Sequence, residues 1–323
     1  MTKFLQVVCV ALGVLVMVGT GNAQKPCGAI TTVALKDSQV LAGSARGELL
    51  LSKAGLLEGS DLCSGPEQWK VATSALPALT NVSATESAFW LLGHQEGIYK
   101  YRVDEKLYEA NLAPESPQAV LDLIEVRNGN SDTVQRLLAV GTRGLFLQSE
   151  NSGDSWEARD LYIDPEWEEP DDYNLYAILQ LRSGRFLAAG ESGVIYWSDD
   201  GVEWERETVG GGATWFGAVE VSGGVLLHGF GGALAYKAAD DDEWLLKQSP
   251  SGNSLYTAAV LENDAVILAG AKGELLEWKA SDELVTLQSG TSAAITDLAA
   301  PDDQLLMATD EGLKSVSFQD LAD

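Results

Sequence analysis

The stretch LLAVGTRGLFLQS, Leu137–Ser149, joins two short apolar runs through a turn that contains Gly141 and Gly144. The first run is apolar throughout, as in a strand buried on both faces, and the second ends in polar residues. Glycines supply the positive backbone dihedrals that a tight hairpin needs. The stretch therefore predicts a β-hairpin whose first strand is buried.

The same pattern occurs seven times along the chain, which indicates a repeat architecture. Each turn begins at a small residue and ends a few positions later at a glycine. The first residues are Gly43, Gly93, Gly141, Gly190, Gly229, Gly270 and Thr309. The last residues are Gly47, Gly97, Gly144, Gly193, Gly232, Gly273 and Gly312. Neighbouring copies are 39 to 50 residues apart.

Each copy also contains two further candidate strands. A short apolar run precedes every hairpin, for example NLYAILQLR at 174–182, and a run with an aromatic residue near its start follows most of them, for example EWERE at 203–207. Four antiparallel strands at this spacing predict the blades of a propeller. We therefore predict an all-β, seven-bladed β-propeller of four-stranded antiparallel blades over residues 24–323.

The seventh copy lacks a fourth strand. We predict that an N-terminal strand, QKPCGA at 24–29, lies outside KSVSF at 314–318 and closes the ring, which removes an open sheet edge. An eighth blade and a ring left open are the alternatives.

Residues 1–23 have the layout of a secretory signal peptide. Lys3 precedes an apolar run from Phe4 to Val18, and small residues follow at 21–23. The run is short for a membrane span. We expect a periplasmic rather than a secreted protein, without direct membrane insertion; an uncleaved anchor is the alternative.

Two cysteines remain after this leader, Cys27 and Cys63. An even pair in an oxidising compartment favours a Cys27–Cys63 disulfide, which would tie the mature N-terminus to the loop at 59–69. Two buried free thiols are the alternative.

The chain is strongly acidic. It has 48 Asp and Glu against 21 Lys and Arg, a formal net charge of −27. Such a surface repels nucleic acid and anionic lipid headgroups, so we expect neither as a partner.

The segment SENSGDSWE, Ser149–Glu157, resembles the Asp-box of bacterial sialidases. Its Asn151 can bond amides of its own turn, Gly153 permits the turn, and Trp156 packs back onto a neighbouring strand. Shorter relatives, SDDGVEW at 198–204 and DDDEW at 240–244, occupy the same place in later copies. We interpret the box as a folding device between the third and fourth strands. It then lies on the face opposite the mouth face, where the second-to-third-strand hairpins and the links between blades open.

A ring of hairpin residues surrounds the predicted mouth of the channel. Its members are Arg46, Glu96, Arg143, Ser192, Gly231, Lys272 and Glu311. A sialidase-like enzyme needs an arginine cluster, a tyrosine nucleophile and nearby acids, and this mixed ring has no such pattern. With only two histidines and no nucleophile motif, we predict no catalytic residues, no cofactor and no metal site.

The link LYIDPEWEEPDDYN, residues 161–174, is long for a connection between blades and contains six acidic residues. Exposed aromatic rings among acids suit a protein contact on the mouth face. The predicted interaction loop consists of Tyr162, Asp164, Trp167, Glu168, Asp171 and Tyr173. Calcium binding by the acids, and a solvated loop whose Trp167 folds back on the blades, are the alternatives.

The seven copies, the boxes SENSGDSW and SDDGVEW, and the leader together resemble the bacterial-neuraminidase-repeat propellers, specifically the photosystem II stability and assembly factor-like family. Photosynthetic members of that family are assembly chaperones with a basic patch. This acidic chain keeps only Arg46, Arg143 and Lys272 at the mouth, which argues against a photosystem role. Non-photosynthetic relatives often accompany efflux transporters of the resistance-nodulation-division superfamily.

The resemblance implies a non-catalytic periplasmic propeller that acts as an accessory, assembly or interaction subunit of a membrane protein complex, in first place such a transporter. The alternative is a secreted glycosidase or lyase that acts on a polysaccharide or sialoside.

Overall fold

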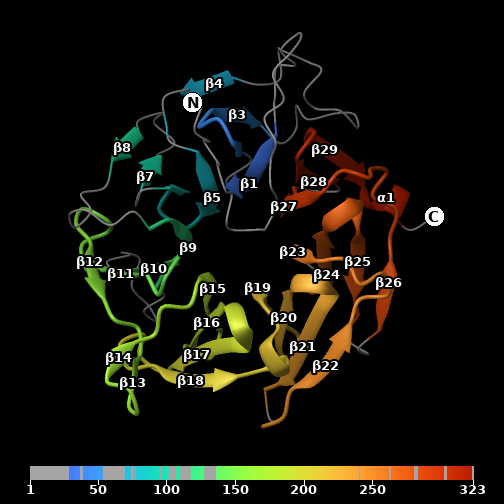
Figure 1. The fold of residues 1–323 in the computed structure, drawn as a ribbon. Coiled ribbons are helices and arrows are strands. Elements are labelled where there is room, and N and C mark those ends of the chain that lie inside the picture. The colour runs from blue at the N-terminus through green and yellow to red at the C-terminus, as the bar shows by residue number, and fades with distance from the viewer. Residues whose placement is uncertain are drawn as a thin grey trace, which may run out of the picture.

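The computed structural model describes residues 29–36, 39–53, 70–73, 76, 78–94, 97–101, 107–109, 118–126, 136–239, 241–261, 263–279, 283–301 and 304–321. Seven antiparallel sheets are arranged in a ring, with the first strand of each sheet nearest the centre (Figure 1). The predicted all-β, seven-bladed propeller is therefore confirmed.

The strands of each blade run outward in sequence order. Blade one contains β1 (Ile30–Lys36), β2 (Gln39–Ser44), β3 (Leu49–Lys53) and β4 (Lys70–Thr73). Blade two contains β5 (Leu79–Ala84), β6 (Phe89–Gly93), β7 (Ile98–Tyr101) and β8 (Leu107–Glu109). Blade three contains β9 (Val120–Glu125), β10 (Leu137–Gly141), β11 (Phe146–Ser149) and β12 (Glu157–Arg159). A small hairpin, β13 (Ile163–Asp164) and β14 (Glu169–Pro170), follows it.

The second half of the ring repeats this order. Blade four contains β15 (Leu175–Gln180), β16 (Phe186–Gly190), β17 (Val194–Ser198) and β18 (Glu205–Thr208). Blade five contains β19 (Trp215–Val221), β20 (Gly224–Gly229), β21 (Ala233–Ala238) and β22 (Leu245–Gln248). Blade six contains β23 (Leu255–Val260), β24 (Val266–Gly270), β25 (Leu275–Trp278) and β26 (Leu284–Thr286). Blade seven contains β27 (Ile295–Ala299), β28 (Gln304–Thr309) and β29 (Gly312–Ser317), followed by helix α1 (Phe318–Leu321).

The ring is joined between its last and first blades by apolar packing. Leu306 and Leu313 of blade seven share a buried cluster with Val33 and Leu50 of blade one. Blade seven has three strands in the described part of the chain. The predicted closing strand falls almost entirely on residues 24–28, which lie outside the described residues, so it stays a prediction.

The two glycines of the 137–149 hairpin have different physical roles. Gly144 has a φ of +68°, as predicted for a tight turn, and a Cβ atom there would also lie 2.2 Å from the carbonyl oxygen of Asp171. Gly141 is not in the left-handed region; instead, a Cβ atom there would lie 2.0 Å from the carbonyl oxygen of Ala119. The amide of Thr142 donates to that same carbonyl at 3.0 Å. The prediction that positive dihedrals require the first glycine is therefore wrong, because close backbone approach requires it.

The Asp-box is a turn that connects blade three to blade two. The Oδ1 atom of Asn151 accepts the amide of Ser155 at 2.9 Å, and Gly153 has a φ of +85°. Trp156 is buried and meets Trp90 edge-on, with ring centroids 6.2 Å apart. The predicted role as a folding device between the third and fourth strands is confirmed.

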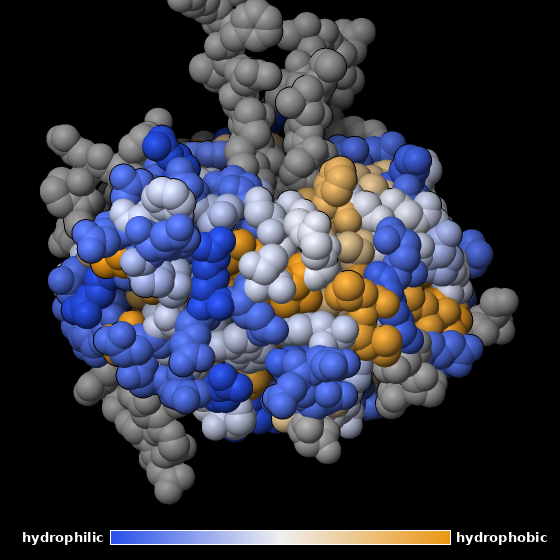
Figure 2. Space-filling view, turned by 60° about the horizontal axis from the view of Figure 1, so that its bottom comes forward, coloured by the Kyte–Doolittle hydropathy of each residue, from blue (hydrophilic) through white to orange (hydrophobic). Residues whose placement is uncertain are grey.

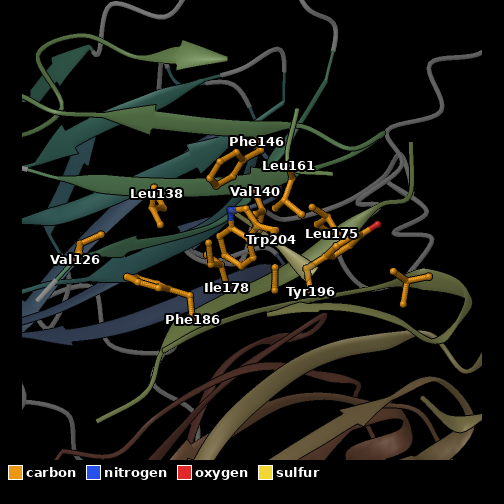
Figure 3. Close-up of a cluster of buried hydrophobic side chains, with 12 residues drawn as sticks. Val126, Leu138, Val140, Phe146, Leu161, Leu175, Ile178, Phe186, Tyr196 and Trp204 are labelled. Atoms are coloured by element: carbon orange, nitrogen blue, oxygen red, sulfur yellow. The ribbon is translucent and has the colours of Figure 1, made fainter. Parts of the chain in front are cut away.

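Aromatic side chains also fill the junction between blades three and four (Figure 3). Trp204, from the shortened box of blade four, has its ring centroid 5.7 Å from Phe146 and 6.3 Å from Phe186. Burial of these large rings stabilises the contact between blades three and four.

Candidate functional site at the mouth of the central channel

Every innermost strand has a β-bulge at its second residue. In blade one, for example, Ile30 and Thr32 pair with the consecutive residues Ser44 and Gly43, so Thr31 is extra. The same irregularity occurs in all seven blades. A bulge redirects side chains, and here the second and third residues of each strand both line the channel.

These two positions make up most of the channel wall. The second residues are Thr31, Thr80, Leu121, Tyr176, Phe216, Tyr256 and Thr296, and the third residues are Thr32, Asn81, Asp122, Ala177, Gly217, Thr257 and Asp297. Together with His228 and a few small apolar residues they surround a cavity of about 240 Å³.

Threonines at the second position link each blade to the next. The hydroxyl of Thr80 donates to the carbonyl oxygen of Val120 at 2.6 Å, and that of Thr296 donates to Ile30 at 3.1 Å. Thr31 makes the corresponding bond to Leu79. Blades seven, one, two and three are therefore joined at the channel by hydrogen bonds.

Carboxylates at the third position make a second set of links. Asp297 of blade seven accepts the amide of Val33 at 3.0 Å and the hydroxyl of Thr32 at 2.8 Å. Asp122 of blade three accepts the amide of Ile178 in blade four at 2.9 Å. Both acids therefore act across a blade junction, and Asp297 does so where the ring closes.

Burial perturbs both carboxyl groups. It raises the pKa of Asp122 to about 7, because desolvation outweighs the amides donated by Ile178 and Leu123. It also raises the pKa of Asp297, against the stabilising bonds from Val33 and Thr32. Perturbed acids in a channel mark a candidate site, although structural links perturb acids in the same way.

Replacing Asp122 by asparagine should change how stability depends on pH. An acid whose pKa is raised on folding contributes stability below its unfolded value, near 3.8, and loses it as pH rises through about 7. The free energy of unfolding of Asp122→Asn, relative to wild type, should therefore increase by roughly 2 to 4 kcal/mol between pH 4 and pH 7. Urea denaturation across this range measures it.

The comparison with wild type removes the opposing effect of His228, whose pKa burial lowers to about 4. A buried neutral histidine loses stability as pH falls below its unfolded pKa, in both proteins alike. If the unfolding free energies of the two proteins changed with pH in parallel, that result would contradict the raised pKa of Asp122.

Aromatic side chains occupy the second position in the other three blades. Tyr176, Phe216 and Tyr256 form a continuous arc, with centroid distances of 5.4 Å and 5.8 Å between neighbours. All three rings are partly exposed. Burial raises the pKa of both tyrosines, and Glu191 and Asp310 add to the effect at Tyr176 and Tyr256 respectively. The arc therefore presents neutral rings with acidic neighbours.

His228 fills the space that the missing side chain of Gly217 leaves in blade five. A Cβ atom on Gly217 would lie 2.2 Å from Nε2 of the imidazole. Its Nδ1 atom lies 3.1 Å from the carbonyl oxygen of Leu255 in blade six. Because a carbonyl only accepts, Nδ1 carries the proton and Nε2 keeps a lone pair.

The second position lies at the mouth end of the channel. The amide of Phe230, in the hairpin of blade five, donates to the carbonyl of Thr214, which directly precedes β19. The same bond joins the hairpin to the start of the inner strand in the other six blades. The arc thus opens onto the face that carries the hairpins, where Phe230 itself is 65% exposed.

The predicted mouth ring is present on this face. Arg46, Arg143, Lys272 and Glu311 are all exposed, and Arg143 and Lys272 occupy left-handed turn positions. Glu96 lies outside the described residues. The ring surrounds the arc but does not line the channel cavity.

Polar residues of the 161–174 loop attach it to Arg206 and Tyr196 of blade four. Arg206 of β18 lies 3.3 Å from Asp164 and 3.4 Å from Asp171, and the buried Tyr196 donates its hydroxyl to Asp171 at 2.7 Å. Tyr162 packs against Tyr196. Tyr173 is likewise partly buried, beside the Arg206 guanidinium. These four predicted contact residues therefore anchor the loop.

Two of the predicted contact residues remain exposed. Trp167 is 70% exposed and Glu168 lies beside it with a φ of +54°. The β13–β14 hairpin that carries them lies at the outer rim of the ring, beside β18 (Figure 1). The loop is predicted to lie on the mouth face, and residues 171–174 reach the mouth hairpin of blade three, where the amide of Gly144 donates to the carbonyl of Tyr173.

Hydrophilic residues cover most of the surface in Figure 2, in which the rim of blades four and five faces the viewer. A hydrophobic patch lies right of its centre. Leu245 and Leu246 of β22 are 44% and 55% exposed. They give the rim an apolar surface separate from the mouth.

Several predictions fall on residues that the structure does not describe. The leader at 1–23, Cys27 and Cys63 are among them, so the signal peptide and the disulfide stay predictions. In the described part of the chain, no group of three or more His, Cys, Asp or Glu side chains is placed to hold a metal ion. No helix there has the length and apolar character of a membrane span.

No family model matches the chain, and no curated protein is significantly similar to it in sequence. Several solved structures share its fold. A streptogramin B lyase aligns with a TM-score of 0.73 at 12% identity, over 91% of this chain and 95% of that one. YCF48 bound to D1 peptide aligns at 0.65 and 15% identity, over 89% and 92%. The WD40 β-propeller domain of Doa1 aligns at 0.66 and 13% identity, over 92% and 95%.

At these identities the similarity establishes the propeller fold alone. The neighbours include an enzyme and propellers of other kinds, and membership of the Asp-box family stays a prediction.

Proposed function

We propose that this chain is a non-catalytic propeller that binds a partner protein at the mouth of its channel. It is exported to the periplasm and serves there as an accessory or assembly subunit of a membrane protein complex. The resemblance of its repeats to the assembly factor-like family extends the proposal to a transporter of the resistance-nodulation-division type.

The observation that carries the proposal is the aromatic surface at the mouth. Tyr176, Phe216 and Tyr256 form a partly exposed arc, and Phe230 stands on the same face with 65% of its surface exposed. Large rigid rings offer apolar contact area at low entropic cost, and such rings dominate binding energy in protein interfaces. A related fold, YCF48, has been solved bound to D1 peptide.

The polar groups of the channel favour binding over hydrolysis. A glycosidase needs one carboxyl group as an acid and a second as a base or nucleophile. Asp122 and Asp297 instead accept backbone amides across blade junctions. The described channel wall also contains no arginine. A glycosidase or lyase activity therefore remains the second choice.

Co-purification from the native cell envelope tests the proposal. Tagged wild-type protein should retain a partner, and Phe230→Ser should reduce its recovery by roughly tenfold, because an exposed aromatic anchor is lost. Leu246→Ser changes a comparably exposed apolar residue on the rim (55% against 65%), and this matched control should leave recovery unchanged. Mass spectrometry of the eluate then shows whether the partner belongs to a transporter.

A third variant separates the mouth from the outer hairpin. Trp167→Ala removes the most exposed large hydrophobic side chain of the described chain. Loss of the partner with Trp167→Ala, but not with Phe230→Ser, would place the contact at the rim. Recovery unaffected by either change would count against the proposed surface.

A further inference from the structure

The side chains of the described channel wall present mainly hydrogen-bond acceptors. The hydroxyl protons of Thr31, Thr80 and Thr296 are used on backbone carbonyls. Those of Thr32 and Thr257 are donated to Asp297. Each hydroxyl therefore offers only lone pairs to the cavity, because a hydroxyl has a single proton.

The amide of Asn81 is used in the same way. Its Nδ2 atom lies 3.2 Å from the carbonyl of Leu121 and 3.4 Å from Asp122. The backbone amides of Val33 and Ile178 are bonded to the two carboxylates. The tyrosine hydroxyls of the arc are the side-chain donors that remain, and they lie at the mouth.

An unpartnered acceptor also faces this cavity. His228 is 2% exposed, and its only hydrogen bond to the described residues is the one from Nδ1 to Leu255. Among the described residues, none donates a hydrogen bond to the lone pair of Nε2. A buried polar atom without a partner has a strong preference for a donor from water or a ligand.

The ionisable groups that line the channel are mainly acidic. Asp122 and Asp297 contribute carboxyl groups, and no lysine or arginine is among the described lining residues. The faces of Tyr176, Phe216 and Tyr256 attract cations through their ring quadrupoles. A wall of acceptors, carboxylates and aromatic faces is complementary to a cationic group with several N–H donors.

We propose that the channel binds an organic ammonium or guanidinium group, presented by a lysine or arginine side chain of the partner protein. The identity of the source rests on the proposed function, whereas the preference for the cationic group rests on the channel alone. An alkyl stem lies against the exposed side of the arc of three rings, and the charged head reaches the carboxylates below them. The overall charge of −27 draws such a group to the protein.

Binding of matched peptides to the full chain tests this inference. The probes are fluorescein-labelled peptides of one glycine- and serine-rich sequence that carry lysine, acetyl-lysine or norleucine at the centre. Anisotropy is measured at about pH 8, above the pKa of Asp122, so that its carboxyl group is ionised. The lysine peptide should bind at least tenfold more tightly than either neutral peptide.

Variants and a competitor locate the site and the source of the cation. Phe216→Leu should weaken the lysine peptide about fivefold, because a cation–π contact is lost while apolar volume is kept. Val202→Ser, an exposed change on the opposite face, should leave binding unchanged. Butylammonium should displace the peptide and butanol should not; butylammonium that binds as tightly as the peptide would identify a free amine as the ligand and overturn the lysine assignment.

Equal affinity for lysine and acetyl-lysine peptides would overturn the inference, as would lysine binding that Phe216→Leu does not alter. The proposed function and the cation site can be contradicted independently. A partner that depends on Phe230 in the envelope, combined with no preference for lysine, removes only the cation site. Specific lysine binding without any co-purified partner removes only the proposed function.

Discussion

The Gly141→Ala variant is expected to lose more than about 3 kcal/mol of unfolding free energy, measured by urea denaturation. The new methyl carbon would lie 2.0 Å from the carbonyl oxygen of Ala119. No side-chain rotation can relieve the overlap, since the backbone at the end of β10 fixes the position of the methyl carbon, and the carbonyl group belongs to the backbone directly before β9. Relief of the overlap must break the bond from Thr142 to Ala119 and displace the hairpin from β9.

Gly211→Ala is the matched control for this change. Gly211 has a φ of +62°, and a Cβ atom there would have no neighbour within 4 Å. Its substitution should cost only about 1 kcal/mol, from the left-handed conformation alone. A Gly141→Ala protein as stable as Gly211→Ala would show that close approach to Ala119 is not what selects glycine at the first turn position.

The Asp297→Ala variant is expected to lose about 2 to 4 kcal/mol of stability and to loosen the junction between blades seven and one. It removes the acceptor of the Val33 amide and of the Thr32 hydroxyl. Hydrogen exchange should then accelerate most in β1 and β27, where these bonds join the two blades. Denaturation and exchange measured on the same samples test both effects.

Asp199→Ala is the control for loss of a carboxylate. Its side chain is 84% exposed and pairs with Arg185 at 2.8 Å, so its removal should change stability by less than about 1 kcal/mol. Faster exchange spread evenly over all seven blades of Asp297→Ala would contradict a role specific to ring closure.

The blades were predictable from sequence because their physics is local. A tight hairpin between apolar runs leaves a clear signature, as in residues 137–149, and sevenfold repetition made it unmistakable. The same signature could not show that close backbone approach requires glycine at Gly141. That requirement depends on Ala119, which lies directly before β9.

The residues that line the channel were not predicted, for a related reason. Tyr176, Phe216 and Tyr256 recur at the second position of three successive inner strands, which was the available signal. Simple alternation assigns neighbouring residues to opposite faces of a strand, so it does not place both the second and third residues toward the channel. The bulge that does so appears only in the register between strands.

For the 161–174 loop, the sequence predicted more contact residues than the structure leaves available. Its aromatic and acidic residues were predicted to be free for a partner because they are conspicuous in the sequence. Arg206, 42 residues away from Asp164, holds two of its carboxylates instead. A charge that lies this far along the chain, on a different strand, cannot be assigned to a loop from sequence spacing alone.

Site-specific photo-crosslinking in the native cell envelope tests the mouth-face site most directly. A benzophenone side chain is placed at Phe230, on the mouth face, or at Val202, which is 46% exposed on the opposite face. The proposed site predicts a discrete protein adduct from position 230 and none from position 202. An adduct from position 202 alone, or from neither position, would contradict it.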